Sequence, residues 1–300
     1  MTERLYWRYP QLSTFTARAI NISPCVEKEG ICDCKEVLVK VWLDQTLFYP
    51  EGGGQPYDKG FFKIAGQGAN FPVIKVMEED GDIVHYVCCP PEELDSLLSL
   101  KGHEICGEID WQRRFDHMQQ HTGQHILSQA CLRVLKASTI GFHLSWEYAS
   151  IDLDIAEINH DQVREVERVA NEVVFGNIPV RAVEYAPSDL PPMVRRRIPK
   201  ETDIVRVIEI GDFDFCACGG THVSSTGQIG LIKIGDIGRA HGGVRVTFRC
   251  GWRALVNYQE QNESIWTCAR LLSVPTNNIE SGVQSLLTKM EEKGQEVKRL

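Results

Sequence analysis

The sequence predicts an α+β fold, in which a small N-terminal β-barrel is followed by an α/β two-layer domain and a helical C-terminal segment. Short β-type runs fill the chain up to Asp110, helical and strand periodicities alternate from there to about Gly251, and the remainder is helical. A composition of 43% hydrophobic and 24% charged residues is typical of a globular protein. We expect domain boundaries at 1–111, 112–254 and 255–300.

The N-terminal region consists of short runs rich in β-branched and aromatic residues, separated by turns. Evenly spaced runs of this kind with Gly-rich connections are typical of a small barrel or sandwich. The expected strands are 37–42, 61–64, 73–76, 83–87 and 104–109, and a short acidic helix is expected over 92–100, after Pro90-Pro91.

A glycine-rich loop separates the first two of these strands. Phe48 to Gly60 contains Gly52, Gly53 and Gly54 in succession, followed by Gln55. Glycine loses the most backbone entropy on ordering, so three in a row are poor in any regular element. A loop that must approach another group closely would tolerate this cost, whereas a wide surface turn is the alternative.

The central region begins with a helix expected over 114–135, whose apolar residues recur at helical spacing and leave one side polar. A second helix is expected over 161–175. Strands are expected over 150–153, 180–185 and 204–210, and the runs 229–234 and 244–248 resemble sheet neighbours of the 204–210 strand.

The C-terminal segment has apolar residues at heptad a and d spacing, and the pattern is still running at the last residue: Val283, Leu286, Met290, Val297 and Leu300. We expect this helix to continue in a longer protein or to form a homodimer with a second copy. A lone amphipathic helix packed on the body is the alternative.

No apolar run long enough for a signal peptide or a membrane-spanning helix is present, so we expect a cytoplasmic protein with no membrane partner. Eleven cysteines, an odd number at irregular spacing, fit reduced thiols better than a disulfide framework. The pairs Cys32/Cys34 and Cys88/Cys89 are interpreted as core or loop thiols.

The net charge of −9 argues against a nucleic-acid partner, but its distribution is uneven. The segment 193–253 has ten Lys and Arg against six Asp and Glu. A local basic face can engage phosphates on an acidic protein because salt screens distant charge. Scattered surface charge is the alternative. The candidate RNA-binding residues are Arg195, Arg196, Arg197, Lys200 and Arg245.

Two pairs of metal-ligand residues, each four positions apart, form the most specific pattern in the chain. His121 and His125 share one face of the expected helix, and Cys218 and His222 flank a Gly-Gly turn. Three imidazoles and one thiolate suit zinc better than magnesium or calcium. Thr122 stands where a zinc protease of the HExxH type has its catalytic Glu, which argues against peptide hydrolysis by that route.

Two further metal-binding residue types lie beside these motifs. Cys216 and His117 are each close enough in sequence to compete for the ion. We expect a core thiol and a helix-surface imidazole instead.

Four segments, in this order, closely resemble the AlaX alanyl-tRNA editing proteins, freestanding relatives of the alanyl-tRNA synthetase editing domain: FYPEGGGQPYDKG, HTGQHILS, CGGTHVSSTGQIG and GGVRVTFRCGWRAL. The resemblance covers nearly the whole chain. It implies a zinc-dependent deacylase that hydrolyses tRNA(Ala) mischarged with serine or glycine. Its zinc ligands would be His121, His125, Cys218 and His222.

The resemblance also bears on specificity and on the form of the protein. Thr139 falls near the position where relatives place a polar residue that contacts the hydroxyl of the amino acid. No aminoacylation domain precedes the barrel, so we expect a stand-alone editor of the long form with a truncated C-terminal region.

Two other functions remain open at this stage. One is a non-catalytic tRNA-binding module whose zinc is structural, and the other is a zinc hydrolase of a small ester or amide. Four simultaneous protein ligands would favour a structural ion, whereas one loose ligand would leave a position for water.

Overall fold

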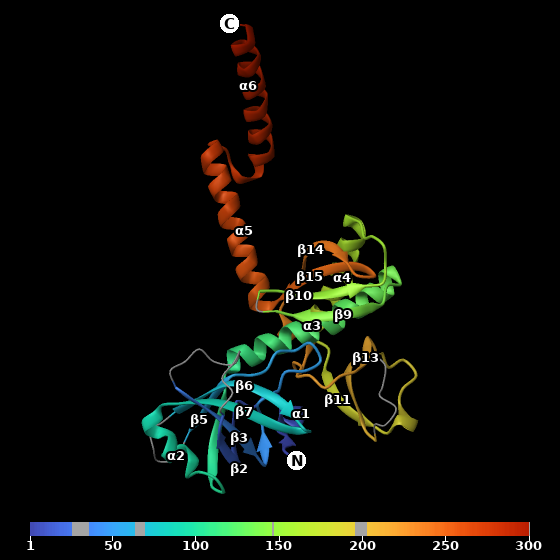
Figure 1. The fold of residues 1–300 in the computed structure, drawn as a ribbon. Helices are drawn as coiled ribbons and strands as arrows, with labels where there is room; N and C mark the ends of the chain where they lie inside the picture. The colour runs from blue at the N-terminus through green and yellow to red at the C-terminus, as the bar shows by residue number, and fades with distance from the viewer. Residues whose placement is uncertain (26–35, 64–69, 146, 196–202, 300) are drawn as a thin grey trace. The chain divides into compact units, whose positions relative to one another are not determined.

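The computed structural model describes residues 1–25, 36–63, 70–145, 147–195 and 203–299. These residues divide into two compact units, Met1–Gly251 and Trp252–Leu300 (Figure 1). No helix within the described ranges is both long and apolar enough to cross a membrane. Several residues singled out in the sequence lie outside the described residues: Cys32, Cys34, Arg196, Arg197, Lys200 and Leu300.

The first part of the larger unit is a closed six-stranded barrel, which confirms the predicted barrel. Its strands follow one another around the barrel in the order β2 (Thr14–Pro24), β3 (Val37–Leu43), β7 (Asp82–Cys89), β6 (Asn70–Glu79), β5 (Gly60–Lys63) and β8 (Glu104–Ile109). Alternate residues of the strands fill the interior, among them Val39 and Val41 of β3.

Short elements surround this barrel. The two-residue strands β1 (Glu3–Arg4) and β4 (Gln45–Thr46) pair in parallel, and α1 (Leu5–Arg8) follows β1. The predicted acidic helix is a 3-10 turn, Pro91–Glu93, that continues as α2 (Leu94–Leu98). Cys88 and Cys89 are buried in β7, and no disulfide links any of the nine cysteines in the described part of the chain.

Helix α3 (Trp111–Leu135) is the central element of the larger unit. Its first turn is capped by the Asp110 side chain, which accepts a hydrogen bond from the backbone N of Arg113. The helix ends at Lys136, which has the left-handed backbone conformation. In Figure 1 it runs between the barrel and the sheet that contains β9, β10, β15 and β14.

The polar side of α3 is buried rather than solvated. Gln120, for example, exchanges two hydrogen bonds with the backbone of Cys250, of 3.0 and 2.8 Å. His117 is 1% exposed, so the prediction of a helix-surface imidazole is wrong. Buried polar side chains need hydrogen-bond partners, and α3 finds them in the surrounding strands and loops.

Two separate sheets complete the larger unit. One has the order β14 (Ile232–Ala240), β15 (Gly243–Cys250), β10 (Ala149–Leu153) and β9 (Thr139–Leu144), and α4 (His160–Phe175) contacts both β14 and α3. The other has the order β11 (Val180–Tyr185), β12 (Val205–Ile210) and β13 (Asp214–Ala217). The prediction that the 229–234 and 244–248 runs pair with the 204–210 strand is therefore wrong. A tight turn at Gly211 folds β13 onto β12 instead, and β11 occupies the other edge of β12.

Strand β9 was not predicted, and it contains a bulge. Asp152 of β10 pairs with Gly141, while the next residue, Leu153, pairs with Thr139, so Ile140 has no opposite residue. Because side chains alternate along a strand, the extra residue returns Thr139 to the face that carries Phe142. Both residues therefore face α3.

A buried ion pair joins the Gly-rich loop to α3. The guanidinium of Arg114 binds the carboxylate of Asp58, and both side chains are fully buried. Asp58 also accepts a 2.7 Å hydrogen bond from the backbone N of Tyr49, and the two residues close the base of the loop through a second bond from Asp58 N to Tyr49 O. The base of the loop is thereby fixed to the helix.

The smaller unit consists of the helices α5 (Gly251–Leu272) and α6 (Ile279–Arg299), with a left-handed residue, Ser273, between them. The predicted helical C-terminal segment is confirmed. The a and d side chains of α6 are exposed over its described length: Val283, Leu286, Met290 and Val297.

Candidate metal centre

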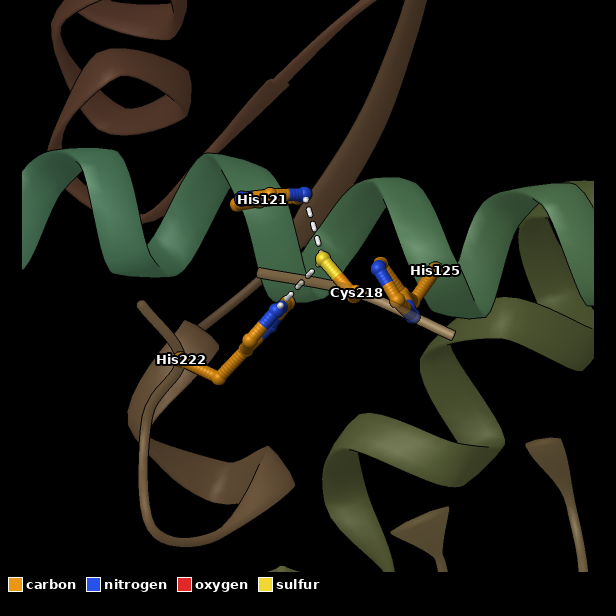
Figure 2. A group of neighbouring side chains, drawn as sticks. All are labelled: His121, His125, Cys218 and His222. Carbon is orange, nitrogen blue, oxygen red and sulfur yellow. Dashed lines mark hydrogen bonds between the residues drawn. The ribbon is translucent and has the colours of Figure 1, made fainter. Parts of the chain in front are cut away.

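The two predicted ligand pairs converge on one point. His121 and His125 project from α3, and Cys218 and His222 belong to the turn that follows β13 (Figure 2). One ligand atom from each of the four lies within 4.8 Å of every other, and all four side chains are buried. Cys218 Sγ lies 3.5 Å from Nε2 of His121 and 3.4 Å from Nε2 of His222.

The Nδ1 atom of each of the three imidazoles contacts a polar side chain. Gln55 lies 2.9 Å from Nδ1 of His121, and Asp214 lies 3.3 Å from Nδ1 of His125. Thr122 lies 3.1 Å from Nδ1 of His222. Metal-binding imidazoles are oriented in this way by a partner on their other nitrogen.

Gln55 determines which nitrogen of His121 carries the proton. Its Oε1 accepts a 3.1 Å hydrogen bond from the backbone N–H of Thr221, and its Nε2 donates to Thr221 Oγ1 at 2.8 Å. Because Oε1 is an acceptor, Nδ1 of His121 must donate to it. The Nε2 atom of His121, which faces Cys218 Sγ, then carries the lone pair that can bind an ion.

The Gly-Gly turn is required by the close approach of the backbone to this hydrogen bond. A Cβ atom on Gly220 would lie 2.3 Å from Cε1 of His121 and 2.9 Å from Oε1 of Gln55. The carbonyls of the turn point to other partners. Arg206 donates to the carbonyls of Cys218 and Gly220, and Trp7 Nε1 donates to that of Gly219 at 2.8 Å.

The electrostatics of the cluster favour a thiolate. Burial opposes ionisation of Cys218, but His121 and His222 beside it outweigh burial and hold its pKa well below the usual value. Burial and repulsion from His121 lower the pKa of His222. For His125, burial is outweighed by Cys216 and Asp214, which raise its pKa.

These features fit a zinc ion. The donor set of three nitrogens and one thiolate sulfur is one that zinc prefers. Within the described part of the chain, Nε2 of His125 is buried without a hydrogen bond. Such a buried polar atom requires a partner, and an ion bound among the four side chains would supply it.

The three glycines that precede Gln55 form the tight turn that places this side chain at the cluster. Gly53 and Gly54 have φ values of +58° and +87°, which favour glycine, and a bridge between Gly52 and Gln55 closes the turn. A Cβ atom on Gly54 would lie 2.7 Å from the ring of Phe142, which itself stacks on His121 with ring centroids 5.3 Å apart. The tip of the loop therefore lies against the cluster and is not a wide surface turn.

Thr139 of β9 contacts Ser128, which lies three residues after His125 on α3. Its hydroxyl donates a 2.7 Å hydrogen bond to Ser128 Oγ, which also accepts a 2.8 Å bond from Gln124 Nε2. The amide oxygen of Gln124 is buried and makes no hydrogen bond to the described residues. Sequence reasoning did not identify Gln124, Ser128 or Asp214, because polar residues on a helix or strand carry no signal of their own.

The two predicted RNA-binding arginines in the described ranges differ in their surroundings. Arg195 binds the buried carboxylate of Asp214 through two hydrogen bonds, and its side chain is 21% exposed. Arg245 on β15 pairs with Asp152 and is 51% exposed. Of the two, Arg245 has the more exposed side chain.

Comparison with known proteins gives the family. The chain is 32% identical to the alanyl-tRNA editing protein AlaX-L of Pyrococcus horikoshii, over 99% of this chain and 72% of that protein. The chain belongs to the AlaX family of alanyl-tRNA editing proteins. The segment 205–247, which contains two of the four clustered residues, matches the family model for the threonyl and alanyl tRNA synthetase second additional domain.

AlaX similarity extends to the synthetases. The alanine-tRNA ligases of Pyrococcus furiosus and Halobacterium salinarum are 33% and 34% identical, over 100% and 99% of this chain. The chain spans only 31% of the length of each of these two ligases. Residues 22–113, which include most of the barrel, match the model for class II (A) tRNA synthetases.

Proposed function

We propose that this protein is a trans-editing deacylase that hydrolyses Ser-tRNA(Ala), Gly-tRNA(Ala) or both. The observation that carries the proposal is the buried cluster of three His and one Cys in a chain whose AlaX relative is named as an alanyl-tRNA editing protein. The reaction cleaves the ester between the amino acid and the terminal ribose, with water as the second substrate.

The zinc ligands in this proposal are His121, His125, Cys218 and His222. Zinc supplies Lewis acidity, which makes water or an ester carbonyl more reactive at neutral pH. Gln55, Asp214 and Thr122 orient the three imidazoles, so the chain itself provides the preorganisation. An aminoacyl ester is already activated, so its hydrolysis requires mainly correct positioning.

We assign recognition of the serine hydroxyl to Thr139. The bulge at Ile140 turns this residue toward α3, beside Ser128 and the buried amide of Gln124. A site built to hydrogen-bond a hydroxyl leaves its own polar groups unpaired when alanine binds, and this disfavours alanine strongly. Glycine must be distinguished by its size.

In the proposal, basic residues contact the phosphates of the tRNA. We assign phosphate contacts to Arg245, Arg196, Arg197 and Lys200. Arg195 is left out because its side chain is only 21% exposed and its guanidinium is bound to the buried carboxylate of Asp214. In this proposal the protein acts in the cytoplasm. It also forms a homodimer through the exposed apolar residues of α6. Sedimentation of the unsubstituted protein and of Leu286→Glu tests the dimer: an unsubstituted protein that sediments as a monomer would refute it.

The deacylation test uses Ser-tRNA(Ala), Gly-tRNA(Ala) and Ala-tRNA(Ala) with zinc-loaded protein, metal-free protein and Cys218→Ala. Zinc-loaded protein is expected to release serine or glycine faster than alanine, and the other two preparations are expected to be inactive. Binding of tRNA with no turnover would support a binding module with structural zinc. Equal hydrolysis of free serine esters without tRNA would support a small-ester hydrolase.

A further inference from the structure

The residues behind the three imidazoles differ in charge. Gln55 and Thr122 are neutral, whereas Asp214 is a carboxylate that is 1% exposed. A buried carboxylate needs a compensating cation, and the structure provides one.

That cation is Arg195. Its Nε and one terminal nitrogen bind the two oxygens of Asp214 at 2.6 and 2.8 Å, and the same terminal nitrogen lies 3.4 Å from the backbone O of His125. The backbone of Arg195 also pairs with β13: its N donates to Phe215 O at 2.8 Å, and its O accepts from Ala217 N at 3.2 Å. One residue therefore fixes the carboxylate, α3 and the strand that leads into Cys218.

A second group of ligand atoms has the right spacing to bind a metal. One atom each from His125, Asp214 and Cys216 lies within 4.8 Å of the others, on the Nδ1 side of the imidazole. Arg195 already holds both carboxylate oxygens of this group. A positive charge at that place disfavours a second cation there.

We propose that Arg195 and Asp214 are the positioning pair of the metal centre. Asp214 holds His125 through Nδ1, so that Nε2 is directed to the four-residue cluster, and Arg195 fixes Asp214 in that position. The inference rests on the proposed zinc site, and it assigns to Arg195 a role different from RNA binding. Neither residue touches substrate in this account.

The test measures zinc affinity by chelator competition and the visible absorption of the cobalt(II)-substituted protein. Loss of such an outer partner weakens metal binding by about 10- to 100-fold. Asp214→Ala is expected to show this loss. Asp214→Asn keeps an acceptor for Nδ1–H and is expected to recover part of it. Arg195→Gln is expected to change the cobalt d–d bands, because Asp214 loses its fixed position and no longer holds the His125 ring in one orientation.

The matched control is Asp152→Asn, which breaks the similar two-bond pair with Arg245 on the sheet. It is expected to leave zinc affinity and the cobalt spectrum unchanged. Circular dichroism of the metal-free variants checks folding. If Asp214→Ala does not fold, the zinc affinities and cobalt spectra of Asp214→Asn and Arg195→Gln test the positioning role.

Parent-like zinc affinity and cobalt spectra in the folded Asp214 and Arg195 variants would overturn the positioning role alone. A parent protein that binds no zinc would instead refute the metal centre itself. The two failures are therefore distinguishable.

Discussion

Gln55 of the Gly-rich loop accepts a 2.9 Å hydrogen bond from the imidazole of His121 on α3. The loop thus contributes a fully buried side chain to the four-residue His/Cys cluster from 66 positions away in sequence. Replacing Gln55 leaves Nδ1 of His121 and the backbone N–H of Thr221 without their acceptor.

We therefore expect Gln55→Ala to weaken zinc binding by about 10- to 100-fold, measured by chelator competition. The matched control is Gln45→Ala, since Gln45 of β4 donates to the backbone carbonyl of Thr16 in the barrel strand β2, and this hydrogen bond is exposed. Equal zinc affinity in the two variants would exclude the orienting role of Gln55.

Substitution of Gly54 combines two penalties. Its φ of +87° disfavours any side chain, and a Cβ atom would meet Phe142 at 2.7 Å. Gly81 is matched in conformation, with φ of +83°, but a Cβ atom there meets nothing within 4 Å.

We expect Gly81→Ala to cost about 1–2 kcal/mol in unfolding free energy. Gly54→Ala should cost more, and it should also weaken zinc binding because Phe142 stacks on His121. Thermal unfolding and zinc titration measure both effects. Identical behaviour of the two variants would mean that the loop does not press on Phe142.

Removal of the Cys218 thiol should abolish stoichiometric zinc. Cys218→Ser keeps the shape of the residue but replaces a preferred thiolate ligand with a hydroxyl. Metal analysis of purified protein is expected to give about one zinc per chain for the parent and far less for the variant. Cys106→Ser, at an exposed position in β8, serves as the control and should retain the metal.

The barrel contains a histidine that makes stability depend on pH. His85 is fully buried, and burial lowers its pKa from 6.5 to about 4. Its Nδ1 donates to Val41 O at 3.0 Å, and Nε2 accepts from Thr46 Oγ1 at 2.9 Å, so the ring is neutral.

Between pH 6.5 and 4, the unfolded chain binds a proton at His85 that the folded protein does not, so unfolding becomes easier as the pH falls. The full effect of this shift is about 3 kcal/mol, present above pH 6.5 and lost by about pH 4. Urea unfolding across this range measures it. His85→Gln should be less stable at pH 7 and should show a flatter dependence, and an equally steep curve would show that other groups cause it.

Thr139→Val should discriminate between the two mischarged substrates. The variant keeps the volume but removes the hydroxyl that bonds Ser128. We expect serine release to fall more than glycine release, measured as single-turnover deacylation rates. Equal losses would show that Thr139 does not read the amino acid.

The sequence was sufficient to predict the elements whose residue pattern is visible within a short stretch of chain. Five of the six barrel strands and the two long central helices follow from period-two and helical patterns, whereas β2 was not predicted. The four clustered residues follow from the spacing of ligand types. Strand β9 was missed because a bulge breaks its alternation and Gly141 weakens the pattern further.

Sheet membership and the residues behind the ligands could not be predicted in the same way. A strand pattern does not state its partner, so β14 and β15 were placed beside β12 when β10 is the true neighbour of β15. Asp214 and Thr122 act only through contacts formed on folding, and no spacing rule connects them to an imidazole.

The ion pair between Arg114 and Asp58 has a consequence for dissecting this protein. A fragment that starts at residue 112 would keep Arg114 but lose three partners of its guanidinium, which are Asp58 and the backbone carbonyls of Leu47 and Pro10. Expressing the chain from residue 112 onward by itself would therefore expose this arginine and remove the contact that fixes α3 to the Gly-rich loop. Such a fragment would also lack Gln55, whose amide oxygen accepts the hydrogen bond from Nδ1 of His121.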